Sequence, residues 1–97
     1  MIWELHRLLM TENKPDNIRI DIWLWRTRFF KTRSKAQKNI RLGCRLNSKK
    51  VFKPSSLLTI GDVIVFSREE NTYALRVLEL GNGRKSFKDA NLLYEKL

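Results

Sequence analysis

Cationic side chains dominate the residues of this sequence that could do chemistry. Twelve of the twenty Lys and Arg residues lie between Arg19 and Lys53, with Asp21 as the one acid, so this window carries a net charge of +11. The rest of the 97-residue chain has a net charge of −1. Lys and Arg bind phosphate, and a basic patch without acids repels itself unless an anion neutralises it. A charge run is usually only a solvated face, but the missing acids favour nucleic-acid binding.

Sequence patterns typical of catalysis are missing. Cys44 and His6 are the single cysteine and histidine of the sequence, too few for a metal cluster or for a nucleophile with a histidine base in the basic window. No glycine-rich phosphate loop followed by Lys and Ser or Thr occurs. Asp21, Asp62 and Asp89 fit helix ends or turns. We expect a binding protein rather than an enzyme, with no cofactor and no metal.

The composition indicates one small folded domain. Hydrophobic residues make up 42% and charged residues 31%, and a chain of this length builds a single core. No apolar run reaches the roughly 18 residues of a membrane helix, and Glu4 and Arg7 interrupt any early secretory segment. A lone cysteine agrees with a reducing compartment. We expect a cytoplasmic monomer that does not contact membranes.

The apolar spacing predicts how the cations are positioned. Residues 1–17 read as an appendage and residues 18–97 as one domain. Apolar residues between Ile20 and Phe30 follow helical spacing, and Asp21 suits the first turn of a helix. Two tryptophans two positions apart cannot share a helix face, so one of Trp23 and Trp25 is expected in the core and the other on the surface.

A second helix is predicted over residues 33–42. Thr32 or Ser34 can cap its start, and Gly43 supplies its end. At helical spacing Ala36 and Ile40 share one face, which is expected to be buried. The opposite arc is basic and consists of Lys35, Lys38 and Arg41.

Beyond Gly43 the apolar period changes to two, which predicts a small antiparallel sheet. Its expected parts are a hairpin around Asn47–Lys50 and two strands, over 63–66 and 73–78, joined across 68–71. A final helix is predicted near Ser86, with a common face formed by Phe87, Ala90, Tyr94 and Leu97.

Several short elements, in this order and spacing, resemble the RNA-binding domain first seen in small-subunit ribosomal protein four, the S4 domain. They are Arg19–Trp25, Arg28–Arg33, Ala36, Ile40, Gly43, Asn47, Lys53–Ser55 and Gly61–Asp62. Within that superfamily the Trp-Leu-Trp, Lys-Thr-Arg and Ala90–Glu95 elements are similar to the heat-shock protein 15 family. One departure is Asn47–Ser48 in place of the family's Asn-Gly, which predicts a longer hairpin turn.

The resemblance implies an α+β, S4-like (αL-type) fold, with two N-terminal helices packed on a small antiparallel sheet and a C-terminal helix. It implies binding to RNA and to the large ribosomal subunit, in the rescue or recycling of stalled subunits that carry a nascent chain on transfer RNA. Expected partners are ribosomal RNA, with transfer RNA and weak DNA binding as further options. An alternative is an accessory module that targets an RNA-modifying enzyme.

The same resemblance, together with the charge pattern, gives the expected RNA-binding residues. Thr32 has a competing role as a helix cap, and an exposed tryptophan could stack on a base. The full set is Arg28, Lys31, Thr32, Arg33, Lys35, Lys38, Arg41, Arg45, Asn47, Lys49, Lys50 and Lys53.

Overall fold

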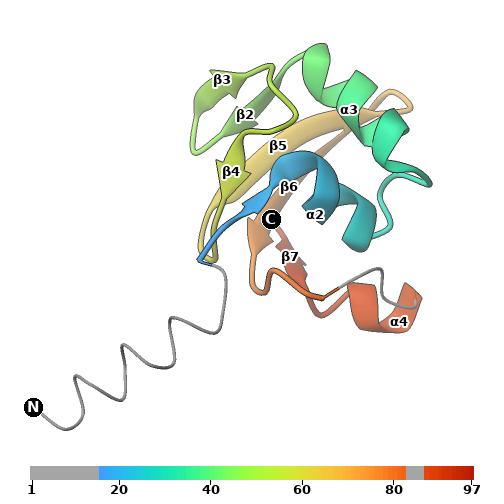
Figure 1. The fold of residues 1–97 in the computed structure, drawn as a ribbon, viewed down its shortest axis with the longest axis vertical. Helices are drawn as coiled ribbons and strands as arrows, with labels where there is room; N and C mark the ends of the chain where they lie inside the picture. Colours follow the sequence, from blue (N-terminus) through green and yellow to red (C-terminus); the bar gives the residue numbers. More distant parts are fainter. Residues whose placement is uncertain (1–15, 83–86) are drawn as a thin grey trace, which may run out of the picture.

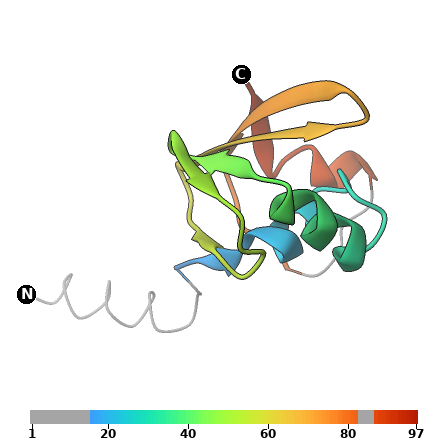
Figure 2. The ribbon, with the colours of Figure 1, turned by 90° about the horizontal axis from the view of Figure 1, so that it is seen from above.

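The computed structural model describes residues 16–82 and 87–97. The helices and strands follow the chain as β1 (Ile18–Arg19), α2 (Ile20–Arg26), α3 (Arg33–Arg41), β2 (Cys44–Leu46), β3 (Lys49–Val51), β4 (Leu57–Leu58), β5 (Val63–Arg68), β6 (Asn71–Val77), α4 (Phe87–Ala90) and β7 (Tyr94–Lys96). The antiparallel main sheet has the strand order β3-β2-β5-β6-β7, and β1 pairs with β4 separately. Helices α2 and α3 lie together on one side of the main sheet (Figures 1 and 2). The predicted α+β fold is confirmed.

The core lies between this helix pair and the sheet. Trp23 from α2 and Ile40 from α3 are fully buried, as are Ile64 and Leu75 from the two central strands. The indole Nε1 of Trp23 donates a hydrogen bond to the Glu79 carbonyl at 2.9 Å, so the buried ring has its polar atom satisfied. Burial of the apolar faces of both helices therefore fixes them on the sheet.

The first helix is shorter than the apolar spacing predicts. It ends at Arg26, the hydroxyl of Thr27 donates to the carbonyl of Leu24, and Arg28 has a φ of 66°. A helix through Phe30 is therefore wrong, because a residue in the left-handed region cannot continue a right-handed helix. One of the two tryptophans was expected in the core, and it is Trp23. The other, Trp25, is partly buried, whereas it was expected on the surface.

The second helix agrees with its prediction. Thr32 is the N-cap, and its side-chain oxygen accepts from the backbone N–H of Lys35 at 3.1 Å. Ser34 lies inside the helix and is not the cap. Gly43 follows the C-cap residue with a φ of 112°, a conformation that glycine adopts without strain. Both ends of α3 are thus set by local sequence.

The hairpin turn between β2 and β3 has two residues, so the longer turn expected from Ser48 is wrong. Asn47 and Ser48 both have positive φ values, 51° and 72°, as a type I′ turn requires. The Asn47 amide stabilises this turn, because its nitrogen donates to Asp62 and its oxygen accepts from the backbone N–H of Val63, each at 2.9 Å.

The C-terminal segment forms a short helix followed by a strand. Helix α4 stops at Ala90, and Tyr94–Lys96 pairs with β6 as β7, so the expected helical face through Tyr94 and Leu97 is wrong. Leu97 is 59% exposed, and the cap residue Ser86 lies outside the described residues. Most of the expected appendage, residues 1–15, also lies outside them. No helix in the described ranges is long and apolar enough to span a bilayer.

Candidate nucleic-acid interface

The loop between α2 and α3 is held against the β5–β6 hairpin by one arginine. Arg68 Nη1 donates to the carbonyl of Phe29, and Nη2 donates to the Tyr73 hydroxyl at 3.2 Å. The guanidinium carbon also lies 5.5 Å and 5.2 Å from the ring centroids of Phe29 and Tyr73. Loop residues 27–32 are therefore fixed by contacts to a part of the chain that is far away in sequence.

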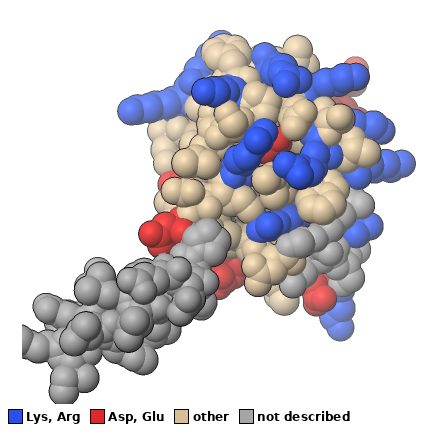
Figure 3. All heavy atoms as spheres, viewed as in Figure 1, with Lys and Arg blue, Asp and Glu red and all other residues tan. Residues whose placement is uncertain are grey.

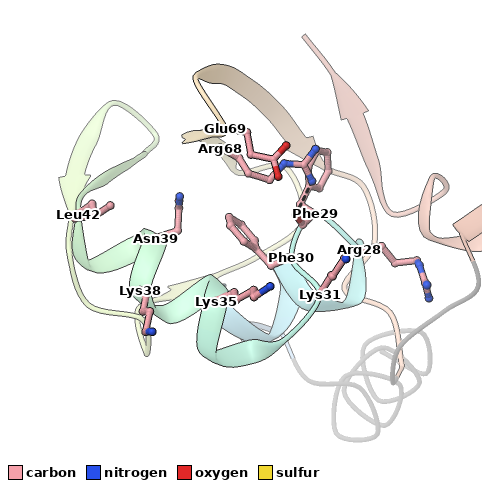
Figure 4. A pocket seen from close by; sticks show the side chains of 10 residues that line it. All are labelled: Arg28, Phe29, Phe30, Lys31, Lys35, Lys38, Asn39, Leu42, Arg68 and Glu69. Carbon is pink, nitrogen blue, oxygen red and sulfur yellow. Dashed lines mark hydrogen bonds between the residues drawn. The ribbon is translucent and has the colours of Figure 1, made fainter.

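An open groove of about 570 Å³, here called the first groove, lies between this loop, α3 and the β5–β6 turn. Its cationic lining residues are Arg28, Lys31, Lys35, Lys38 and Arg68. Glu69 at the turn is the one acid in the lining. In Figure 4 the Phe30 ring points into the middle of the groove, whereas the Arg28 side chain extends away from it. The floor is apolar and the rim is basic.

The second groove lies on the other side of α3 and has a volume of about 500 Å³. Its charged lining residues, Arg19, Arg41 and Lys53, are all basic, and Phe52, Pro54 and Gln37 contribute to its wall. Because Ala36 and Ile40 face the core, α3 forms a ridge with a basic groove on each side.

The only acid in the basic window is withdrawn from the surface. Asp21 is fully buried and accepts from Arg19 Nη2 at 2.8 Å, from Arg19 Nε at 3.0 Å and from Gln37 Nε2 at 2.9 Å. Gln37 belongs to α3, so the carboxylate also ties the two helices together. The outward face of the window consequently presents no acid to compete with a phosphate.

The β2–β3 hairpin extends the basic surface. Arg45 and Lys50 are directly opposite each other in the register, and both are exposed. Like charges at opposed positions destabilise a hairpin unless an anion lies between or beside them. Lys49 is also exposed on β3, one of the two edge strands of the main sheet. In the space-filling view, Lys and Arg predominate over the part of the face formed by α3 and this hairpin (Figure 3).

The predicted site residues thus fall into three neighbouring groups. Arg28, Lys31, Lys35 and Lys38 line the first groove, Arg41 and Lys53 line the second, and Arg45, Lys49 and Lys50 lie on the hairpin. Thr32 caps α3, and the Asn47 amide is occupied by the hairpin turn. Arg33 is exposed at the start of α3.

The partly buried Arg26 and the buried Cys44 contribute to the fold rather than to the basic surface. Burial lowers the pKa of Arg26, with a smaller effect from the charge of Arg33, and the Arg26 guanidinium donates to the carbonyls of Leu80 and Gly81. Burial also raises the pKa of the Cys44 thiol, which keeps it protonated and unreactive. The described residues contain no group of His, Cys, Asp and Glu that could hold a metal.

The expected site leaves out several residues that line the grooves, among them Arg19, Arg68 and Phe52. Phe52 had a detectable signal, an apolar residue between Lys50 and Lys53, but its exposure depends on the path of the following loop. Arg68 had no local signal because its role depends on Phe29, distant in the chain.

Residues 18–64 match the family model of the S4 domain. This range includes α2, the α3 ridge between the two grooves, and the basic β2–β3 hairpin. Over these residues the chain is therefore similar to the S4 domain.

Curated proteins named heat shock protein 15 are also similar to this chain. The homologue from Aeromonas salmonicida is 37% identical over 79 residues, which cover 81% of this chain and 60% of that protein. Heat shock protein 15 from Escherichia coli (strain K12) is 29% identical over 87 residues, which cover 90% of this chain and 65% of that protein. The chain thus spans less than two thirds of the length of these relatives.

A solved structure has the same fold. Heat shock protein 15 of Vibrio cholerae superposes with a TM-score of 0.77 at 28% sequence identity, covering 84% of this chain and 82% of that one. That structure is described as trimeric, whereas the expectation for this chain was a monomer.

Proposed function

We propose that this chain binds structured RNA and associates through it with the large ribosomal subunit, without catalysing a reaction. The observation that carries the proposal is the acid-poor basic surface around α3, in which the only acid of the window, Asp21, is buried in an ion pair. The match of residues 18–64 to the S4-domain model supports the same conclusion. Such a surface binds phosphates by charge, and its rigid backbone selects RNA by shape.

The two grooves and the β2–β3 hairpin can each contact a different part of the RNA backbone. The α3 ridge carries cations on both flanks, so it can lie along an RNA groove with a phosphate strand on each side. Lys31, Lys35 and Lys38 would contact one strand, and Arg41 and Lys53 the other. Phosphate binding by Arg45 and Lys50 would relieve the repulsion between their opposed charges. Arg is suited to planar, bidentate contacts, while Lys acts as a mobile point charge.

The cellular role of the chain is a second part of the proposal. We infer that the chain acts in the cytoplasm, in rescue or recycling of large subunits that carry a nascent chain on transfer RNA. The similarity to heat shock protein 15 supports this inference. Weak binding to DNA is expected from charge alone, since non-specific contacts to phosphate do not distinguish the two polymers.

Sedimentation of the protein with ribosomal subunits from a lysate tests the proposal. We expect it in the large-subunit fraction at low salt and its release as salt rises, because about five to eight neutralised phosphates give a slope of log K against log salt near −4 to −7. Absence from that fraction at low salt, or recovery with a separate RNA-modifying enzyme instead, contradicts ribosome association.

A triple variant tests the position of the site. Replacing Arg28, Lys31 and Arg33 by Gln is expected to remove most RNA binding with a nearly unchanged thermal midpoint, because Lys31 and Arg33 are exposed and Arg28 is only partly buried. Full binding by a folded triple variant would exclude the helix junction as part of the interface.

A further inference from the structure

Phe52 is an exposed ring inside a basic groove. It is 52% exposed, and of the aromatic side chains that the structure describes it is the one that is more than half exposed. The other large exposed apolar side chains in the described ranges are aliphatic. Phe52 differs from these aliphatic residues because its ring has a π face on which a nucleic-acid base can stack.

The ring is held in place by a fixed backbone. A Cβ atom on Gly43 would lie 3.1 Å from Phe52 Cε1, so the ring rests directly on the glycine backbone. The following loop is tied to the start of α2 because Ile20 N donates to the Ser56 carbonyl at 2.9 Å and Asp21 N donates to the Pro54 carbonyl at 3.4 Å. Part of the ring is thus packed against Gly43, and about half of the side chain remains exposed.

Cations surround the ring. Lys50 Nζ lies 5.8 Å from the ring centroid, and Arg19, Arg41 and Lys53 line the same groove. Every charged side chain in that lining is basic, which favours an anionic occupant. A second copy of this chain is disfavoured there because the chain itself carries a net charge of +10.

We propose that the second groove binds an unpaired RNA nucleotide, with its base stacked on Phe52 and its flanking phosphates held by Arg41 and Lys53. This inference rests on the proposed RNA-binding function and adds the kind of RNA that the surface selects. Bases in loops and bulges can leave the helix and stack on aromatic rings, whereas paired bases are inaccessible. A groove of about 500 Å³ is in the usual range of sites for small ligands, roughly 300–1,000 Å³. The chain should therefore bind an RNA helix next to an unpaired base more tightly than a fully paired RNA helix.

The test compares two RNA probes, a hairpin with an adenosine loop and a blunt duplex of the same stem, by fluorescence anisotropy at fixed salt. The variant Phe52→Leu keeps an apolar side chain against Gly43 but removes the ring. We expect it to weaken binding to the hairpin about tenfold or more and binding to the duplex less than twofold. Phe52→Trp should restore hairpin binding. Ile60→Ala, which truncates an aliphatic residue of similar exposure (55%) outside this groove, should leave both affinities unchanged.

Each outcome has a defined meaning. Equal binding of both probes by the wild-type protein, or unchanged hairpin binding by a folded Phe52→Leu variant, overturns the stacking proposal while leaving RNA binding intact. The proposal also fails if the substitution changes the sedimentation of the protein alone but not its RNA binding, since the ring would then serve self-association. If the wild-type protein binds neither probe at low salt, the proposed function itself fails.

Discussion

Neutralising one flank of α3 separates the electrostatic contribution of the first groove from its role in the fold. Lys35 and Lys38 are exposed, line that groove and leave the buried face of the helix untouched. We predict that Lys35→Gln with Lys38→Gln weakens RNA binding strongly at low salt. The thermal midpoint should move by less than about 8 °C, since two exposed substitutions together change the free energy of unfolding by at most about 1 kcal/mol.

The magnitude follows from counterion release. Each neutralised phosphate contributes about 0.7 to 0.9 to the slope of log K against log salt, so loss of two contacts should make the slope shallower by about 1.4 to 1.8. At about 0.1 M salt this corresponds to binding that is about 25- to 60-fold weaker, and near 1 M salt the variant and the wild-type protein should bind equally. Anisotropy titrations of ribosomal RNA across this salt range measure both quantities.

The matched control removes two cations from the opposite edge of the sheet. Arg76 and Lys96 lie on β6 and β7, far from β3 in the strand order. Arg76 pairs with Glu95 at 3.8 Å, and Lys96 Nζ lies 6.0 Å from the centroid of the Tyr73 ring. Arg76→Gln with Lys96→Gln changes the net charge by the same amount. A slope change as large as that of the α3 variant would show that total charge, and not the groove, determines binding, and it would refute the assignment.

Three further predictions concern stability. Ser48→Gly should raise the free energy of unfolding by about 1 kcal/mol and the thermal midpoint by several degrees, because Ser48 has a φ of 72° in a type I′ turn; a lower midpoint would contradict the strain argument. Asp21→Asn should lower the free energy of unfolding in urea by about 2 kcal/mol, because the Arg19 bidentate pair is lost from a buried site, and an unchanged value would mean that the pair is not stabilising. Burial raises the pKa of Cys44 above its ordinary value of 9.0, so the protonated thiol favours the folded state. That contribution is complete below about pH 9 and is lost as pH rises further, and urea titrations of wild type and Cys44→Ala should converge in this range.

Local signals were sufficient where the structure depends on near neighbours. Thr32 and Gly43 determine the ends of α3, and the alternation after Gly43 determines the hairpin. The ridge of cations on α3 follows directly from helical spacing once Ala36 and Ile40 are buried. The fold class and most of the basic surface were therefore predictable from the sequence.

Long-range pairing explains what could not be predicted. The apolar spacing that continues to Phe30 reflects burial of Phe29 and Phe30 by the loop, and the contacts responsible come from the β5–β6 hairpin. Spacing near the C-terminus suited a helix, yet pairing of Tyr94–Lys96 with β6 gives a strand. Exposure of Phe52 likewise depends on a loop tied to α2. In each case the deciding partner is distant in sequence.

Arg68 provides a way to separate preorganisation of the interface from its charge. The variant Arg68→Lys keeps the charge in the first groove but loses the planar group that bonds to Phe29 and Tyr73 together. Losing one such hydrogen bond lowers the free energy that holds loop 27–32 in its binding conformation by about 1 kcal/mol. RNA binding should therefore weaken about fivefold, while the slope of log K against log salt stays the same. The Lys35 and Lys38 variant should instead change the slope. An Arg68→Lys protein with a shallower slope and normal loop protection in hydrogen exchange would show that Arg68 contacts phosphate directly rather than positioning the loop.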